Sequence, residues 1–234
     1  SPLVERIAGL SPAGAEMAAR TRVVSFGRDD TARHERMSRF ADLRIAWGGE
    51  EAVAAVRALP ARWECDDLVF GPRRSFAVVD PAAVDDRVLS RLANDIVYFD
   101  QLACSSPQVI FVRDEAGGAA AAFAERLGPV VEAGAKRFRR HPLDWGETYL
   151  IELDRQRAIL EGGAVHRDEA TQWTVAVLDA PAAHISCANR FVQVVPYTDL
   201  AAVAAFLPAN VQTVITAGAE THAAALSDVL APAG

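Results

Sequence analysis

Cys104 is the residue of this sequence best placed for covalent chemistry. It lies in a short loop, Ala103-Cys-Ser-Ser-Pro107, between a segment of helical periodicity and an apolar segment typical of a β-strand. A loop at the edge of a sheet holds a side chain where a cleft can form. A thiolate there can act as a nucleophile, and its own backbone N–H can help to hold a developing oxyanion. Cys104 is therefore a candidate nucleophile, against the alternative of a small buried hydrophobe.

The other cysteines and the histidines are weaker candidates. Cys65 and Cys187 are interpreted as structural thiols. Three cysteines, widely spaced, predict neither a disulfide framework nor a zinc site, so no metal is expected. Each histidine is interpreted as a surface or hydrogen-bonded residue rather than as the partner of a Cys–His pair. These histidines are His34, His141, His166, His184 and His222.

A second candidate is the turn Trp47-Gly48-Gly49, where an apolar segment meets a helical one. Glycine lets the backbone approach a phosphate, and a helix N-terminus offers free N–H groups and partial positive charge. Glu50 and Glu51 weaken this interpretation, because their carboxylates already provide the negative charge that the helix dipole favours at this N-terminus. The dinucleotide fingerprint G-x-G-x-x-G does not occur in the sequence. A purely structural turn is the alternative.

Strand-like and helical segments alternate along the chain. Strands are expected at 21–26, 41–47, 68–70, 75–79, 109–112, 173–178, 191–195 and 213–216. Helices are expected at 1–20, 31–40, 50–59, 85–99, 119–134, 147–160, 199–206 and 222–230. This alternation predicts an α/β fold with largely parallel, Rossmann-type layers.

Composition narrows the function classes. Of the 234 residues, 51% are hydrophobic and 24% charged, with a net charge of −7 and no basic stripe, so a nucleic-acid surface is not expected. No apolar run reaches the roughly 20 residues that a membrane-spanning helix needs. Nothing at the first residue resembles a signal peptide, and the cysteine pattern predicts a cytoplasmic protein.

Three blocks together resemble the LuxC-type fatty-acyl-CoA reductases, a branch of the aldehyde dehydrogenase superfamily. The specific block is Phe99-Asp-Gln-Leu-Ala-Cys-Ser-Ser-Pro-Gln108. Two supporting blocks are Ala46-Trp-Gly-Gly-Glu-Glu-Ala-Val53 and Phe70-Gly-Pro-Arg-Arg-Ser-Phe-Ala-Val78. The similarity covers nearly the whole chain and implies an aldehyde-dehydrogenase-like fold.

The resemblance implies an NADPH-dependent, acylating acyl-CoA reductase. Cys104 would match the nucleophile that takes the acyl group from acyl-CoA or an acyl-carrier thioester, and hydride from NADPH would reduce the enzyme thioester to a fatty aldehyde. Trp47, Gly48 and Gly49 would meet the cofactor's phosphates. Phe70 and Gly71 would lie against its nicotinamide end. Homo-oligomerisation is a further expectation from the family.

Two positions depart from the superfamily pattern. Val69 stands where oxidising members carry a glutamate base, and without a carboxylate there the chain would not activate water against the thioester. Where the superfamily has a Glu-x-Phe contact to the nicotinamide ribose, this chain has Asn189-Arg190-Phe191. Asn189 and Phe191 are therefore the expected cofactor contacts in this region.

Full members of the family are about twice as long, in line with two domains. The resemblance therefore implies a partial chain, with part of a cofactor domain at 1–67 and a catalytic domain at 68–234. The chain could return to the cofactor domain near its C-terminus. Two other functions stay open. One is an acyltransferase or thioesterase that uses the same cysteine without a nicotinamide, and the other is a non-catalytic scaffold subunit.

Overall fold

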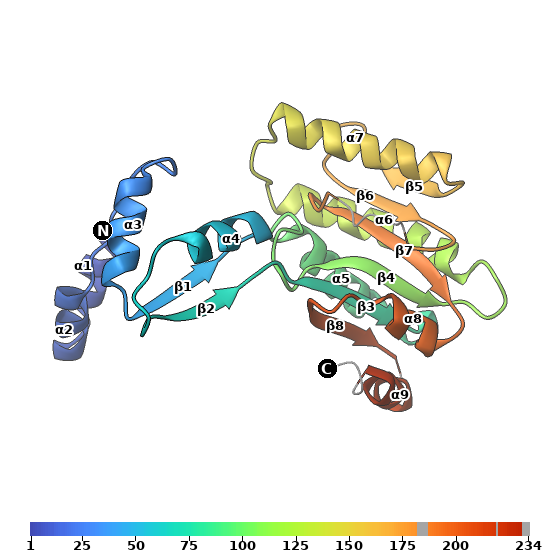
Figure 1. Ribbon diagram of the computed structural model, residues 1–234. Coiled ribbons are helices and arrows are strands. Elements are labelled where there is room, and N and C mark those ends of the chain that lie inside the picture. Colours follow the sequence, from blue (N-terminus) through green and yellow to red (C-terminus); the bar gives the residue numbers. More distant parts are fainter. Residues whose placement is uncertain (182–186, 219, 231–234) are drawn as a thin grey trace. The chain divides into compact units, whose positions relative to one another are not determined.

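The computed structural model describes residues 1–181, 187–218 and 220–230 (Figure 1). The chain divides into two compact units, Ser1–Gly71 and Pro72–Gly234, each with a β-sheet. The boundary predicted after residue 67 falls within a strand that belongs wholly to the first unit. The roles predicted for the two parts, cofactor binding and catalysis, stay predictions.

The first unit is built around one β-α-β repeat. Strands β1 and β2 pair in parallel, and α4 connects them. The helices are α1 (Pro2–Ala8), α2 (Pro12–Arg20), α3 (Thr31–Phe40) and α4 (Glu50–Ala58), and the strands are β1 (Leu43–Trp47) and β2 (Asp66–Phe70). The register places Trp47 opposite Phe70, so the carboxyl ends of both strands lie side by side.

Two predictions for the N-terminal region were wrong. The single helix expected over 1–20 is two helices, because the Ser11 side chain accepts from the Gly14 N–H and Pro12 starts a new first turn. The strand expected over 21–26 has no strand geometry. Val23 and Val24 are exposed, and this segment pairs with no strand among the described residues. An apolar run without a partner strand has no ladder to satisfy its backbone.

The second unit contains a six-stranded sheet in the order β5-β6-β7-β4-β3-β8. All neighbours are parallel except the edge strand β5. Its strands are β3 (Arg74–Val79), β4 (Pro107–Arg113), β5 (Ala164–Arg167), β6 (Thr174–Val177), β7 (Phe191–Tyr197) and β8 (Val211–Ala217). Its helices are α5 (Asp86–Val97), α6 (Ala119–Arg137), α7 (Trp145–Leu160), α8 (Leu200–Phe206) and α9 (Glu220–Leu230).

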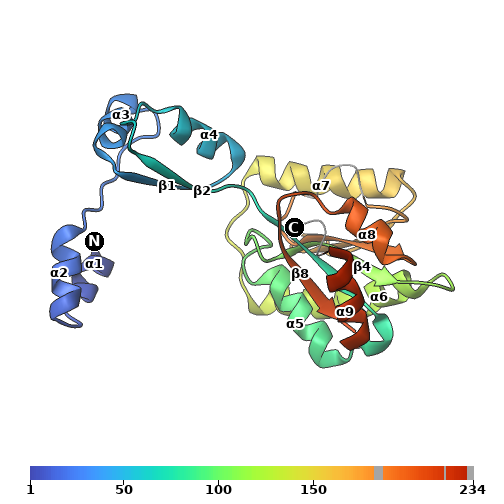
Figure 2. The same cartoon turned by 60° about the horizontal axis from the view of Figure 1, so that its bottom comes forward.

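Helices cover both faces of this sheet (Figures 1 and 2). Side chains alternate along β3, so that Ala77 and Val79 join the core under α5 and α6, whereas Phe76 and Val78 join the core under α7, α8 and α9. A parallel sheet that is buried on both faces is read from nearly continuous apolar runs. The prediction of an α/β fold with largely parallel layers is confirmed.

Candidate functional site

The loop that carries Cys104 joins α5 to the central strand β4. The loop precedes the first residue of β4, and the neighbouring strands β3 and β7 run parallel to β4. The loop therefore lies at the edge of the sheet where these strands begin. The Ser106 N–H donates to the Ala103 carbonyl at 3.0 Å, which closes a tight turn around Cys104 and Ser105. Cys104 is exposed, as a nucleophile must be.

Buried side chains hold this turn from the sheet side. The Ser75 hydroxyl, at the start of β3, donates to the Cys104 carbonyl at 2.6 Å. The Gln101 amide donates to the Pro107 carbonyl at 2.7 Å, and Gln108 donates to the Gln101 carbonyl at 3.3 Å. Ser75 and Gln101 are almost fully buried. The backbone that presents the thiol is therefore fixed by contacts that solvent does not weaken.

Of the six non-glycine residues with left-handed backbone in the described part of the chain, five lie in two loops at this edge and the sixth is Thr171. Asp100 and Gln101 in the Cys104 loop have φ of 53° and 60°, and the turn before β7 has φ of 57°, 55° and 63° at Ala188, Asn189 and Arg190. Non-glycine residues in the left-handed region cost on the order of 1–3 kcal/mol each and persist only where the surrounding structure enforces them. Such strain is typical of functional sites.

An ion pair joins the two strained loops. Arg190 Nε donates to Asp100 Oδ1 at 2.7 Å, and Arg190 is 1% exposed. A second nitrogen of the same guanidinium donates to the Phe138 carbonyl. The Cys104 loop and the turn at 188–190 are thus connected side by side, although 90 positions separate Asp100 from Arg190 in the sequence.

His141 binds the same carboxylate. Its Nδ1 lies 2.8 Å from Asp100 Oδ2, and its Nε2 lies 3.3 Å from Glu147 Oε1. Hydrogen bonds to Asp100 first and to Glu147 second raise the pKa of His141. The sequence predicted His141 to be a surface or hydrogen-bonded residue, but it did not predict this contact to the candidate loop. No spacing rule could have found it, because His141 and Asp100 are 41 positions apart. His184 lies outside the described residues.

The remaining cysteines differ from Cys104. Cys187 is half-buried, and burial followed by the nearby Asp154 carboxylate raises its pKa to about 12. Its thiol is therefore protonated at neutral pH, in keeping with the predicted structural role. Cys65 is half-buried, and its sulfur lies 3.7 Å from the Asp66 carbonyl.

Asn189 and Phe191 lie at the amino edge of β7. The Asn189 side chain accepts from Arg140 at 3.1 Å and donates to the Cys187 carbonyl at 3.3 Å. Phe191 begins β7 with its ring in the core. The structure therefore places Asn189 close to the Cys104 loop through its neighbour Arg190, with its polar atoms engaged by the protein. Their cofactor contacts stay predictions.

The first unit brings the other predicted cofactor residues together. The Gly48 N–H donates to the Phe70 carbonyl at 3.2 Å, and the rings of Trp47 and Phe70 lie 5.3 Å apart. Gly71 follows directly after β2. These residues therefore form one continuous surface at the carboxyl ends of β1 and β2, which is where open α/β sheets bind nucleotides.

The turn at Gly49 has the features of a phosphate site. Gly49 is the N-cap of α4 and makes no side-chain cap, which leaves the first N–H groups of the helix without that partner. A methyl group added at Gly49 would meet nothing within 4 Å, so packing does not demand a glycine there. Glu50 and Glu51 occupy the first turn of α4. The residues fit a dinucleotide phosphate, with two carboxylates nearby.

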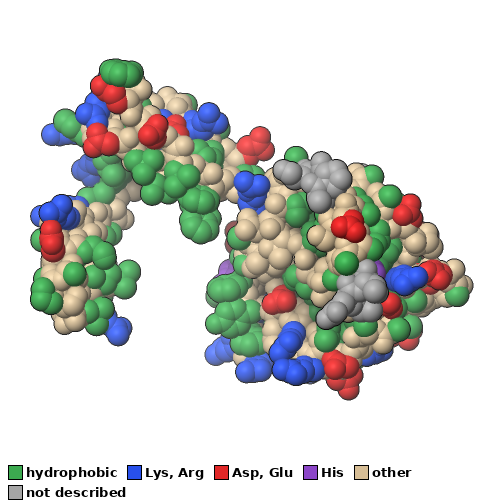
Figure 3. All heavy atoms as spheres, turned by 90° about the horizontal axis from the view of Figure 1, so that it is seen from below, with side chains coloured by type: hydrophobic (Ala, Val, Ile, Leu, Met, Phe, Trp, Pro, Cys, Tyr) green, Lys and Arg blue, Asp and Glu red, His purple; other side chains and the backbone are tan. Residues whose placement is uncertain are grey.

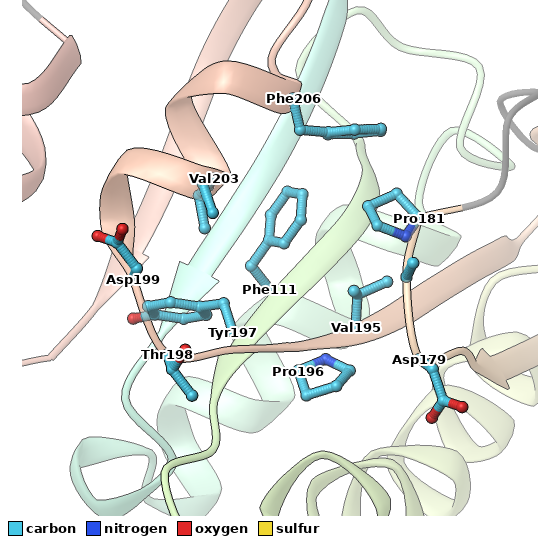
Figure 4. A pocket seen from close by; sticks show the side chains of 12 residues that line it. Phe111, Asp179, Pro181, Val195, Pro196, Tyr197, Thr198, Asp199, Val203 and Phe206 are labelled. Carbon is cyan, nitrogen blue, oxygen red and sulfur yellow. The ribbon is translucent and has the colours of Figure 1, made fainter.

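A cavity of about 340 Å³ lies away from all the predicted site residues. Figure 4 shows Tyr197, Val203 and Phe206 around Phe111 in its wall. It opens along the carboxyl halves of β4 and β7, whereas the Cys104 loop precedes the amino end of β4. This cavity is therefore not part of the candidate site around Cys104.

No group of three His, Cys, Asp or Glu side chains among the described residues could hold a metal ion. No helix in the described part of the chain combines the length and apolarity needed to cross a membrane.

Comparison with known proteins gives a family match over most of the chain. The model of the family described as acyl-CoA reductase (LuxC) matches residues 2–234. The long-chain acyl-protein thioester reductase of Aliivibrio fischeri is 27% identical over 150 residues, which are 64% of this chain and 30% of that protein. Its counterpart in Vibrio harveyi is 40% identical over 83 residues, 35% of this chain and 17% of that protein. The matched part is thus under a third of these relatives.

Solved structures give the fold. A NAD-dependent benzaldehyde dehydrogenase from Corynebacterium glutamicum matches 93% of this chain and 52% of its own, with a TM-score of 0.68 and 15% identity. A putative methylmalonate-semialdehyde dehydrogenase from Sinorhizobium meliloti 1021, complexed with NAD, matches 94% and 50%, with a TM-score of 0.69 and 14% identity. The predicted aldehyde-dehydrogenase-like fold is confirmed.

Proposed function

Because the chain belongs to the LuxC acyl-CoA reductase family, we propose that it carries the nucleophile and part of the cofactor site of a long-chain acyl-thioester reductase. The observation that carries this proposal is the exposed thiol of Cys104 on a turn fixed by Ser75 and Gln101. The names of the relatives favour an acyl group delivered as a protein thioester, with acyl-CoA as the other donor.

In the first step, the Cys104 thiolate attacks the carbonyl carbon of the acyl thioester. The new carbon–sulfur bond forms on Cys104, the bond to the donor sulfur breaks, and the donor leaves as a thiol after it takes up a proton. The Cys104 N–H donates to no acceptor in the described part of the chain, so it can hydrogen-bond the oxyanion. The acylation splits one difficult transfer into two easier ones.

NADPH, when bound, supplies the hydride that reduces the acyl group to the level of an aldehyde. Within the chain, the N–H groups at Gly49 and the start of α4 would hold the diphosphate. Trp47 and Gly48 would lie with Gly49 at the phosphates, Phe70 and Gly71 would lie against the nicotinamide end, and Asn189 and Phe191 would supply the further cofactor contacts. The choice of NADPH over NADH follows from the family resemblance.

Val69 supports reduction over hydrolysis. It is a half-buried residue of β2, paired with Ala46. By the family resemblance, it stands at the sequence position where oxidising members carry a glutamate base. A thioester that meets no activated water persists long enough to be reduced.

The test is covalent labelling of the full chain with a long-chain acyl thioester, followed by intact-mass measurement. One acyl adduct is expected on the wild type and none on Cys104→Ala. The matched variants Cys65→Ala and Cys187→Ala should label as the wild type does. Addition of NADPH should discharge the adduct with release of aldehyde. Labelling without NADPH oxidation would favour an acyltransferase or thioesterase, and no labelling of Cys104 would refute the proposal.

A further inference from the structure

A polar cavity of about 390 Å³ lies beside the Cys104 loop, within the second unit. It is lined by the segment between α6 and α7 and by the turn before β6. Three successive basic residues, Arg139, Arg140 and His141, contribute to its wall, together with Thr171 and Gln172. None of these residues has a role in the acyl transfer described above.

Two contacts attach this cavity to the candidate site. His141 binds Asp100 of the Cys104 loop at 2.8 Å, and Arg140 binds Asn189 of the adjoining turn at 3.1 Å. The basic segment is thus connected to both strained loops at the amino edge of the sheet. A ligand in the cavity would lie on the same side of the unit as the nucleophile.

The positive charge of Arg140 has no directly bound carboxylate. Its guanidinium donates to the Thr171 carbonyl and to the carbonyl and side-chain oxygens of Asn189. Its Nε is buried without a hydrogen-bond partner in the structure. Burial lowers the pKa of Arg140, and the Asp100, Glu147 and Asp168 carboxylates offset only part of this effect.

Arg139 adds a second uncompensated charge at the rim. It is exposed and lies within ion-pair distance of no carboxylate among the described residues. His141 differs, because Asp100 and Glu147 both contact its ring. Asp100 and Glu147 thus bind His141, and Asp168 binds Arg155. In the described part of the chain no carboxylate is bound to the guanidinium of Arg139 or of Arg140.

We propose that this cavity binds a phosphate group of a substrate, with Arg139 and Arg140 as its cationic donors. Guanidinium matches phosphate in charge and in hydrogen-bond geometry. The inference rests on the proposed function, because acyl thioesters of CoA or of phosphopantetheine and NADPH all carry phosphate. The shared group is the phosphate, and the experiment separates its two sources.

The test is calorimetric titration of the full chain with coenzyme A, with 4′-phosphopantetheine and with NADPH, at one fixed ionic strength. Arg139→Gln should raise the Kd of the acyl-donor ligands or of NADPH at least about fivefold, as loss of a charge-assisted contact at an exposed site predicts. The matched control is Arg137→Gln, which removes the same charge two residues earlier. Its guanidinium lies over the Phe138 ring and does not line the cavity.

A loss confined to coenzyme A and phosphopantetheine would assign the cavity to the acyl donor, and a loss confined to NADPH would assign it to the cofactor. Unchanged affinity for all three ligands in Arg139→Gln, an equal loss in Arg137→Gln, or no binding to the wild type would overturn the inference. Acylation of Cys104 is measured separately by mass. Phosphate binding without acylation would therefore reject the proposed function and leave the cavity assigned.

Discussion

Asp100 is the residue on which the candidate site depends most. One of its oxygens accepts from the buried Arg190 and the other contacts His141, so a single carboxylate joins three separate segments. It does so from a left-handed backbone conformation, next to Gln101 in the same conformation. The position of the Cys104 turn therefore depends on charges that do not take part in the chemistry themselves.

We predict that Asp100→Asn destabilises the second unit by about 3 kcal/mol, because Arg190 would keep a buried charge without its counter-ion. The measurement is the urea midpoint of unfolding. Asp86→Asn is the matched control, since Asp86 is fully exposed and lies 3.8 Å from Arg126. Its effect should stay within about 0.5 kcal/mol.

The double variant Asp100→Asn/Arg190→Met provides the second half of this test. It removes both charges together and should recover much of the stability that the single variant loses. If Asp100→Asn alone unfolds at the wild-type midpoint, the ion pair does not hold the two loops.

The residue scale also marks the limit of sequence reasoning. The small neighbours of Cys104 and its place between a helix and a strand predicted an exposed thiol, and the thiol is exposed. The contacts of the Asp100 carboxylate with Arg190 and His141 were not predicted. Its members lie 41 and 90 positions apart, and such contacts are decided by strand order rather than by local pattern.

At the scale of elements, the apolar pattern predicted the interior strands of the large sheet and its edge strand β8. The strands predicted at 75–79 and 109–112 lie within β3 and β4, and their apolar side chains fill both cores. The four-residue edge strand β5 was missed, because His166 and Arg167 make it resemble a polar turn. Helix starts were close to prediction, since Asp85 and Asp144 cap α5 and α7 with their side chains.

Gly163 and Gly49 differ in the space around their Cα atoms, since Gly163 is closely packed and Gly49 is not. A methyl group at Gly163, between α7 and β5, would lie 2.5 Å from the Val177 carbonyl oxygen. At Gly49 the same group would meet nothing within 4 Å. We predict that Gly163→Ala lowers the free energy of unfolding by about 2 kcal/mol, because the backbone must shift to admit the methyl group.

Gly49→Ala should change stability by less than about 1 kcal/mol, because its backbone suits alanine and only the cap preference is altered. Its NADPH affinity should fall, since the methyl group would occupy the space over the start of α4. Thermal unfolding and cofactor titration of both variants give the comparison. Wild-type affinity in Gly49→Ala would show that no phosphate lies against this turn.

At the scale of the whole molecule, the two units differ in how much hydrophobic core each one has. The second has two hydrophobic cores on opposite faces of six strands. In the first, Ala46 and Val53 are the only hydrophobic residues among 1–71 that are buried. One face of its two strands exposes large apolar side chains, namely Leu43, Ile45, Trp47, Leu68 and Phe70. Figure 3 shows hydrophobic side chains gathered on this unit.

We predict that residues 72–234 fold alone and residues 1–71 do not. A two-stranded sheet with one covered face is marginal in water, whereas a sheet covered on both faces can stand as a domain. Heat denaturation followed by circular dichroism should give a cooperative transition for 72–234 and none for 1–71. A sharp transition in the isolated 1–71 segment would contradict this account.

The large sheet ends on two unlike strands. β5 is short, antiparallel and carries His166 and Arg167, features that discourage a further strand from joining. β8 has seven residues, Val211–Ala217, with no charged side chain, and on its outer side it pairs with no strand among the described residues. The free backbone N–H and C=O groups on the outer side of β8 can therefore pair with a strand from another chain and extend the sheet. If copies of this chain form the expected homo-oligomer through a continuous sheet, β8 is the edge strand at which the two sheets would join.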